Sequence, residues 1–130
     1  MRLWLDDIRL APFGWTWAKN YDEAVELLLT GAITDASLDH DLGVIVPEGY
    51  LDARDAGLLV CHPDVLEEDP LAKSGYDLCL WMAEHDIWPS RSVRVHSHNP
   101  IGAKRMCGVV DRYGPYTTRC IYVPYEHEEP

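Results

Sequence analysis

Short apolar runs alternate with amphipathic segments along this chain, a pattern that indicates strands alternating with helices. The first run, from Arg2 to Leu5, stops abruptly at Asp6-Asp7, which is typical of a buried parallel strand that opens onto a polar crevice. The breaking residues at 11–14 indicate that the helix expected after this strand is shortened or lost. Apolar, aromatic and β-branched content predicts further strands at 15–18, 36–39, 93–95 and 117–123.

Three segments combine helical periodicity with a recognisable start. Each follows an asparagine or a serine, which favours the N-cap position because its side chain accepts a hydrogen bond from the first turn. Pro100 also stands at a first helical position, where its missing N–H is tolerated. The predicted helices run from Asn20 to Gly31, from Ser74 through His85 and from Asn99 to Tyr113. In the second helix, one stripe at helical spacing comprises Leu78, Trp81, Met82 and His85.

The order of these elements predicts one domain over residues 1–130, an open and mostly parallel five-stranded sheet with helices on both faces. Residues 44–73 interrupt the pattern with prolines at 47, 63 and 70, and we interpret them as an insertion after the third strand. A connection of this length is either disordered or a lid over a site. Residues 126–130 form an acidic tail.

The composition excludes several classes of protein. Lys and Arg total 11 and Asp and Glu total 22, so the formal net charge of −11 disfavours non-specific binding to nucleic acid. No segment approaches the roughly 20 apolar residues of a membrane span, and acids interrupt the N-terminus before a signal-peptide core can form. We therefore expect a cytoplasmic protein. The widely spaced cysteines are expected to be reduced and to pack as small apolar residues: Cys61, Cys79, Cys107 and Cys120.

Three carboxylates follow two of the predicted strands. Asp6 and Asp7 end the first strand and Asp39 ends the third, and ligands of open parallel sheets bind at this edge. Acids that meet in one crevice repel each other unless they are protonated or neutralised by a cation. Oxygen ligands suit Mg²⁺ or Mn²⁺, so the sequence predicts a divalent metal site here. The alternative is that these are ordinary solvated loop acids.

Histidines flank the same edge. His40 and His96 are candidates for a general acid and base, and Asp41 would orient His40. Either histidine could instead ligate a softer metal or serve as a structural hydrogen-bonding residue. His98 and His62 are weaker candidates.

A phosphate site is predicted where the helix at Pro100 begins. The free N–H groups of its first turn, with the side chains of Ser97, Asn99 and Lys104, could hold phosphate oxygens. Trp15 and Trp17 are close enough to the acidic pair in sequence to flank a ligand.

Together these motifs resemble the receiver domains of response regulators, in which one strand ends in Asp-Asp, another in Asp and a third in a hydroxyl residue. The resemblance implies a receiver or flavodoxin-like fold, with Asp6 and Asp7 as the metal pair. It also implies that Asp39 occupies the phosphoacceptor position and Ser97 the position of the switch hydroxyl.

Four segments are more specifically similar to the family of cyclic-phosphate processing receiver domains: Leu3–Arg9, Ser37–Gly43, Gly75–Asp77 and Val95–Pro100. The similarity covers nearly the whole chain except the insertion and the tail. The chain departs from signalling receivers at the end of the last strand, where Tyr122-Val123-Pro124 stands in place of the lysine that holds the phosphoryl group. His40 and Asp41 are also additional, and both differences favour hydrolysis over signalling.

The leading hypothesis is therefore a metal-dependent phosphoesterase that acts on a cyclic nucleotide or a 2′,3′-cyclic phosphate end. It assigns Mg²⁺ or Mn²⁺ to Asp6, Asp7 and Asp39, and acid–base catalysis to His40, Asp41 and His96. Substrate binding is assigned to Arg9, Ser97, Asn99 and Lys104. The alternatives are a non-catalytic module that binds a nucleotide or a partner protein, and a phosphoacceptor domain.

Overall fold

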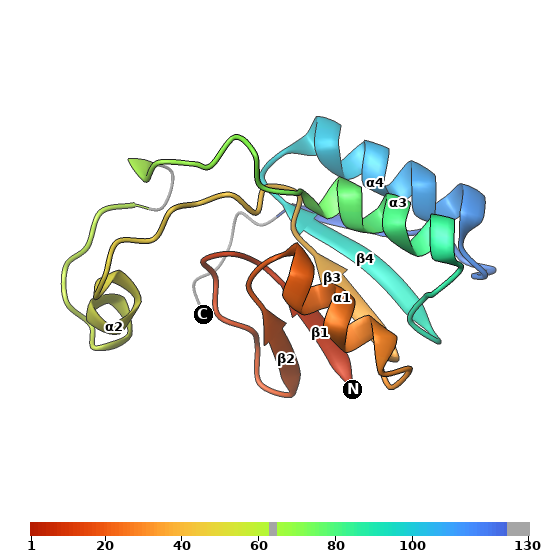
Figure 1. Ribbon diagram of the computed structural model, residues 1–130, viewed down its shortest axis with the longest axis horizontal. Coiled ribbons are helices and arrows are strands. Elements are labelled where there is room, and N and C mark those ends of the chain that lie inside the picture. The colour runs from red at the N-terminus through yellow and green to blue at the C-terminus, as the bar shows by residue number, and fades with distance from the viewer. Residues whose placement is uncertain (63–64, 125–130) are drawn as a thin grey trace.

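The computed structural model describes residues 1–62 and 65–124, and the predicted acidic tail lies outside them (Figure 1). All strand pairs are parallel, and the strand order is β2-β1-β3-β4-β5. The strands are β1 (Arg2–Leu5), β2 (Trp15–Ala18), β3 (Asp35–Leu38), β4 (Ser92–Ser97) and β5 (Ile121–Pro124). The helices are α1 (Tyr21–Leu29), α2 (Tyr50–Asp55), α3 (Gly75–His85) and α4 (Pro100–Tyr113). This parallel five-stranded α/β architecture confirms the predicted receiver-like sheet.

The predicted helix starts are confirmed by their caps. Asn20 accepts the Glu23 N–H before α1, and Asn99 accepts the Gly102 N–H before α4. Ser74 forms a reciprocal capping box with Asp77 at the start of α3. These bonds satisfy backbone donors that the first turn leaves without helical partners. The α3 stripe is confirmed at Leu78 and Met82, which are buried, whereas Trp81 is only partly buried and His85 is exposed.

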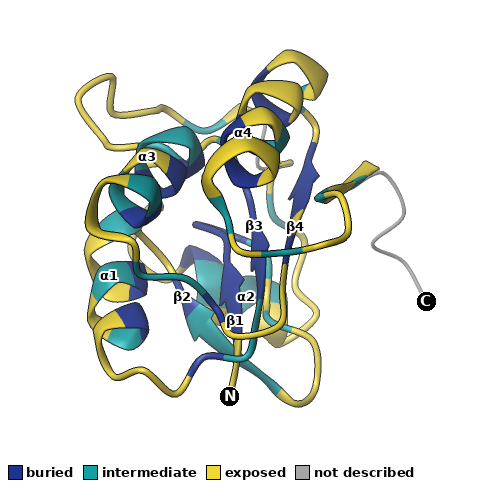
Figure 2. Ribbon diagram, turned by 90° about the vertical axis from the view of Figure 1, so that its right-hand side faces the viewer, coloured by how far each residue is buried: buried dark blue, intermediate teal, exposed yellow. Residues whose placement is uncertain are grey.

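All three longer helices lie on one face of the sheet (Figures 1 and 2). Helix α1 leads from β2 to β3, α3 from β3 to β4 and α4 from β4 to β5, so all three connections cross the sheet in one direction. Right-handed crossovers in one direction place their helices on the same side. The predicted loss of a helix between β1 and β2 is confirmed, and it removes the connection that would have covered the other side. The prediction of helices on both faces is therefore wrong for the described residues.

Alternate strand residues divide between the two faces. One set packs beneath the helices in the apolar core and includes Leu3, Leu5, Leu38, Val93 and Val95. The other set, which we call the helix-free face, includes Arg2, Trp4, Trp15, Ser37, Arg94 and His96. Its edge is open enough for two arginine side chains to stack on Trp15, each about 5.0 Å from the ring centroid. On β1 to β4 this face therefore consists of aromatic and polar groups, whereas β5 adds the aliphatic side chains of Ile121 and Val123.

One predicted boundary needs correction, and the predicted insertion contains ordered structure. The last strand begins at Ile121 rather than at 117, because residues 117–120 form bends and irregular backbone. The segment 44–73 contains α2, and its two arms pair at an isolated antiparallel bridge between Val44 and Glu68. This insertion extends from the strand ends on the side where β1 and β3 terminate (Figure 1). No helix among the described residues is long and apolar enough to cross a membrane.

Candidate metal and phosphate site

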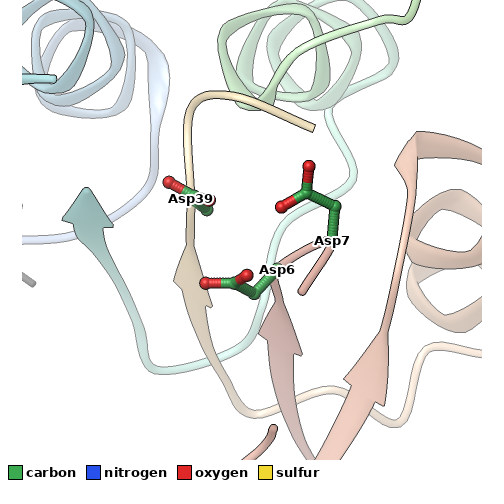
Figure 3. Close-up of side chains that lie close together, drawn as sticks. All are labelled: Asp6, Asp7 and Asp39. Carbon is green, nitrogen blue, oxygen red and sulfur yellow. The ribbon is translucent and has the colours of Figure 1, made fainter. Parts of the chain in front are cut away.

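The three predicted acids meet where β1 and β3 end. Leu5 and Leu38 are paired across these neighbouring strands, so the residues that follow them lie side by side. One carboxylate oxygen from each of Asp6, Asp7 and Asp39 lies within 4.8 Å of the others. Their exposed fractions are only 0%, 7% and 5%, so the acids form a buried cluster (Figure 3).

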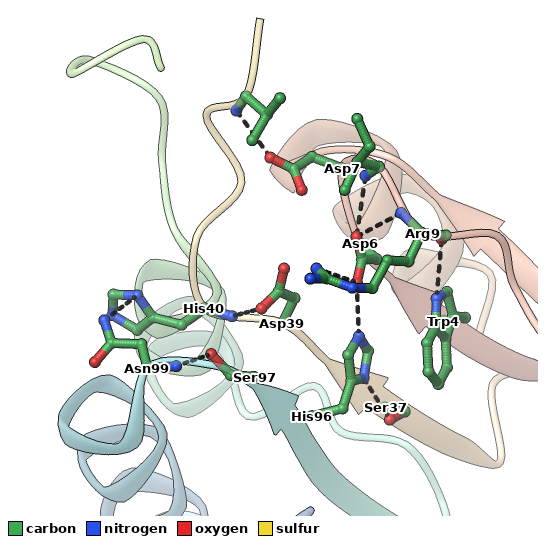
Figure 4. A network of polar contacts seen from close by, with 12 residues as sticks. Trp4, Asp6, Asp7, Arg9, Ser37, Asp39, His40, His96, Ser97 and Asn99 are labelled. Carbon is green, nitrogen blue, oxygen red and sulfur yellow. Dashed lines mark hydrogen bonds and ion pairs between the residues drawn. The ribbon is translucent and has the colours of Figure 1, made fainter. Parts of the chain in front are cut away.

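Both oxygens of Asp6 are fixed by the protein. The backbone N–H groups of Ile8 and Arg9 donate to Oδ1 at 3.0 and 2.8 Å. His96 Nε2 lies 3.1 Å from Oδ2, and Arg9 Nη1 lies 3.9 Å from the same oxygen. These donors set the orientation of the Asp6 carboxylate (Figure 4).

Asp7 and Asp39 each receive one backbone donor. The Val44 N–H donates to Asp7 Oδ2 at 2.8 Å, and the His40 N–H donates to Asp39 Oδ1 at 2.8 Å. Each carboxylate therefore uses one oxygen for the backbone, and its other oxygen can take a ligand. The Val44 bond also ties the start of the insertion to the acidic cluster.

The cluster is electrostatically costly when it is empty. Burial raises the pKa of Asp7 to about 6, and the charge of Asp6 adds to this. Burial also raises the pKa of Asp39 well above its usual range, with the charges of Asp6 and Asp7 acting in the same direction. A bound cation would remove both penalties, and an all-oxygen donor set is the one that Mg²⁺ and Mn²⁺ prefer. The residues present thus fit a hard divalent ion.

A small pocket of about 90 Å³ opens beside the cluster. Its polar lining comprises Asp7, Arg9, Asp39, Asp41, Glu68 and His98. The predictions for Arg9 and Asp41 thus agree with their placement. Glu68 and His98 are residues that sequence reasoning missed or ranked low, although an acidic run at 67–69 and the histidine-rich end of β4 were visible signals.

His40 lies at the margin of this pocket rather than in its lining. Its Nδ1 is 2.8 Å from Asp41 Oδ1, and this hydrogen bond lowers the pKa of Asp41. The ring packs against α4, where a Cβ on Gly102 would come within 2.4 Å of the imidazole Cδ2. The predicted pairing of His40 with Asp41 is therefore present, and it is the carboxylate that faces the pocket.

His96 does not reach the pocket at all. Its side chain lies on the helix-free face, 3% exposed, and stacks on Trp4 with ring centroids 3.8 Å apart. Its two ring nitrogens contact Ser37 and Asp6. Burial lowers the pKa of this imidazole, so the ring is neutral at neutral pH. The prediction that His96 exchanges protons with substrate does not agree with this placement.

A family comparison agrees with this geometry. The model of one family, the cyclic-phosphate processing Receiver domain, matches residues 1–112 of the 130. The chain belongs to this family. No curated protein and no solved structure matches the chain. It is thus a receiver domain of a family named for the processing of cyclic phosphates.

Three of the predicted phosphate ligands of this receiver domain, Ser97, Asn99 and Lys104, lie outside the pocket lining. Ser97 is buried, and its Oγ accepts the Asn99 N–H at 3.0 Å. Asn99 uses its Oδ1 to cap α4, and Lys104 is exposed on that helix outside the pocket lining. Trp15 lies on the helix-free face, so it does not flank the pocket.

Two further contacts hold the backbone of the receiver site. Trp17 does not line the pocket, but its Nε1 donates to the Asp6 carbonyl at 2.7 Å. Gly75 donates its N–H to the His40 carbonyl at 2.8 Å, and a Cβ on Gly75 would lie 1.9 Å from the Asp39 carbonyl oxygen. Only glycine permits this approach.

Proposed function

We propose that this receiver domain is a metal-dependent phosphoesterase that hydrolyses a cyclic phosphate, either a cyclic nucleotide or a 2′,3′-cyclic phosphate end. The observation that carries the proposal is the buried cluster of Asp6, Asp7 and Asp39, two of whose acids, Asp7 and Asp39, line one pocket together with Arg9. Three acids beside an arginine suit a site in which a cation and an arginine together neutralise a phosphoryl group.

Asp7 and Asp39 would hold Mg²⁺ or Mn²⁺ through the oxygens that the backbone does not use, and Asp6 would complete the negative charge. The ion would supply positive charge toward a phosphoryl oxygen and would favour ionisation of water. Arg9 is only 16% exposed and reaches into the pocket from the loop after β1. It would bind a non-bridging phosphate oxygen with charge-assisted hydrogen bonds.

The size of the pocket indicates which part of the substrate it takes. A volume of about 90 Å³ is smaller than the roughly 300 Å³ at which small-molecule sites begin, so it suits the phosphate alone. A second cavity of about 370 Å³ adjoins it, and both are lined by Asp7 and Val44. The larger cavity has a mostly apolar lining that includes Leu42, Ile45 and Leu51. We assign the sugar and base to it, with the insertion 44–73 as the lid.

Hydrolysis needs one proton acceptor and one proton donor. Water attacks phosphorus, one P–O ester bond of the ring breaks, and the proton of the water and the proton of the new hydroxyl must both be transferred. Asp41, held by His40, faces the pocket and would accept the first proton. His98 lines the same pocket and would donate the second to the leaving oxygen. The proton-transfer role proposed from sequence for His96 therefore passes to His98.

The deciding experiment incubates the protein with 2′,3′-cyclic, 3′,5′-cyclic and cyclic dinucleotide substrates and Mg²⁺ or Mn²⁺, followed by chromatography. Asp39→Asn should abolish product formation. The matched control is Asp35→Asn, which changes the same residue type at the opposite end of β3 and should leave turnover intact. Turnover that survives in Asp39→Asn, or that does not depend on a divalent ion, would overturn the proposal.

A non-catalytic module that binds a nucleotide is the second candidate. It is favoured if the same ligands bind with metal dependence and no product forms. The phosphoacceptor reading is weaker, because β5 ends in Tyr122-Val123-Pro124, without the lysine used by signalling receivers. A covalent mass increase on Asp39 after incubation with a small phosphodonor and Mg²⁺ would support it.

A further inference from the structure

We propose that Ser37 and His96 form a hydrogen-bond relay on the helix-free face that positions Asp6 for metal binding. The inference deepens the proposed function and rests on it, since Asp6 belongs to the cluster assigned to the metal. His96 then acts through a carboxylate and contacts no substrate, which is a different role from acid–base catalysis.

The relay crosses three neighbouring strand ends. Ser37 on β3 places its Oγ 2.7 Å from His96 Nδ1, and the opposite nitrogen, Nε2, lies 3.1 Å from Asp6 Oδ2 (Figure 4). All three side chains are buried, with exposed fractions of 0% for Ser37, 3% for His96 and 0% for Asp6. Such short contacts between buried polar groups are directional, because a misoriented partner leaves an unsatisfied group in the interior.

The donors along the relay can be assigned from chemistry. Arg94 Nε can only donate, and it lies 3.3 Å from Ser37 Oγ. The hydroxyl accepts from Arg94, which leaves its own hydrogen available for donation to His96 Nδ1. A neutral imidazole with an accepting Nδ1 carries its hydrogen on Nε2, where it donates to the Asp6 carboxylate. The opposite tautomer would place a lone pair against a carboxylate oxygen. The Asp6 carboxylate thus selects the Nε2–H tautomer, and Ser37 complements it by donating to Nδ1.

The packing of His96 holds the ring in one plane. Trp4 stacks on the imidazole with an interplanar angle of 6°. Trp4 Nε1 also donates to the Arg9 carbonyl at 3.2 Å, which anchors the loop whose N–H groups bind Asp6. Substrate in the pocket cannot approach Nε2 without displacing Asp6 from it. The position of the ring is thus suited to orienting a carboxylate and unsuited to proton exchange with a ligand.

Two substitutions separate positioning from catalysis. The amide nitrogen of glutamine overlays Nε2 of histidine and can still donate to Asp6, whereas the shorter asparagine reaches only the place of Nδ1. We expect His96→Asn to weaken Mn²⁺ binding by about 10- to 100-fold, the range typical of groups that orient metal ligands. His96→Gln should restore most of that affinity. Calorimetric titration of the metal-free full chain with MnCl₂ measures both, and thermal unfolding verifies that each variant is folded.

The opposite result identifies a catalytic histidine. If both variants bind Mn²⁺ like the unchanged protein and both lose turnover, His96 exchanges protons and the relay is refuted. Equal loss of Mn²⁺ affinity in the two variants would also refute it, because the glutamine donor would then have no effect.

The tautomer itself can be measured without altering His96. Two-bond ¹H–¹⁵N spectra of the metal-free protein should show protonated Nε2 and unprotonated Nδ1 for His96, and Ser37→Ala should reduce this preference. A protonated Nδ1 with a bare Nε2 in the unchanged protein would overturn the inference. If the unchanged protein neither binds Mn²⁺ nor turns over substrate, the proposed function fails, whereas the spectrum still decides whether the relay exists.

Discussion

Replacing Asp7 with asparagine should stabilise the metal-free protein at neutral pH. Asp7 is 7% exposed and its pKa is raised from 3.8 to about 6, mainly by burial. A raised pKa means that the folded protein binds the proton more tightly than the unfolded chain. Folding stability from this group is therefore complete at about pH 4 and is lost as the pH rises to about 6. Asparagine keeps an oxygen for the Val44 N–H and never ionises.

The size of this stabilisation follows from the pKa shift of Asp7. From 3.8 to about 6 is about 2 pH units, and each unit corresponds to roughly 1.4 kcal/mol, so an ionised Asp7 costs about 3 kcal/mol at pH 7. Ionisation of Asp39 also destabilises the folded protein at neutral pH, because the pKa of Asp39 is raised too. The difference in unfolding free energy between Asp7→Asn and the unchanged protein should thus be small at about pH 4 and approach 3 kcal/mol at about pH 7.

Urea unfolding across this pH range, in EDTA and in excess Mg²⁺, measures the effect. Mg²⁺ at about 100 times its dissociation constant stabilises the folded state by about 2.7 kcal/mol and should bring the two proteins close to equal stability at neutral pH. At about 1,000 times the dissociation constant the gain is about 4.1 kcal/mol, which should reverse the order. Only the unchanged protein, in which Asp7 can ionise, should gain the full stabilisation by Mg²⁺. The comparison of the two proteins at each pH cancels the contributions of acids that do not interact with Asp7. Asp39 does interact with it, and because the Asp7 charge raises the pKa of Asp39, relief of this repulsion adds to the stability of the variant.

Asp35→Asn is the matched control. The pKa of Asp35 is lowered by its hydrogen bonds from Arg91 and Ser92, despite some burial, so its ionised form stabilises the fold and its removal should destabilise the protein at neutral pH. An unchanged protein that is equally stable in EDTA at about pH 5 and pH 7, or an Asp7→Asn variant that behaves like Asp35→Asn, would refute the electrostatic reasoning.

Three further substitutions or treatments test other parts of the structure. Gly75→Ala should destabilise the protein by about 1–3 kcal/mol in thermal or urea unfolding, because its Cβ would overlap the Asp39 carbonyl, whereas Gly108→Ala on the open side of α4 should be neutral or stabilising. His98→Gln should lower kcat by about 10²- to 10⁴-fold while Mn²⁺ affinity stays the same, and an unaltered kcat would exclude it as the proton donor. Mild oxidation should link Cys107 to Cys120, whose Sγ atoms lie 3.1 Å apart, and peptide mapping of the product would show whether this pair forms first.

Local sequence signals were sufficient to predict the helices and strands and the acidic cluster. The caps at Asn20, Ser74 and Asn99 act within one turn, so the sequence alone locates the helix starts. The convergence of Asp6 and Asp39 could be predicted as well, because parallel strands bring their carboxyl ends to one edge whatever lies further away. Arg9 and Asp41, which the sequence suggested for substrate binding and catalysis, line the pocket, and each is within two or three residues of these acids.

Long-range packing decided the rest. His96 lies in β4, whereas His98 follows the end of the strand, where the alternation of side chains no longer applies. The sequence ranked His96 higher, yet His96 stacks on Trp4 and His98 lines the pocket. Glu68 reaches the pocket only because the arms of the insertion pair with each other.

The physical reason is the period of a strand. Successive side chains point to opposite faces, so a motif fixes which residues share a face, but the role of that face depends on where the helices pack. The sequence by itself determined a parallel α/β domain with a cluster of acids at its strand ends. The tertiary structure alone decided that all three longer helices cover one face, and that His96 on the other face contacts Asp6 instead of a substrate.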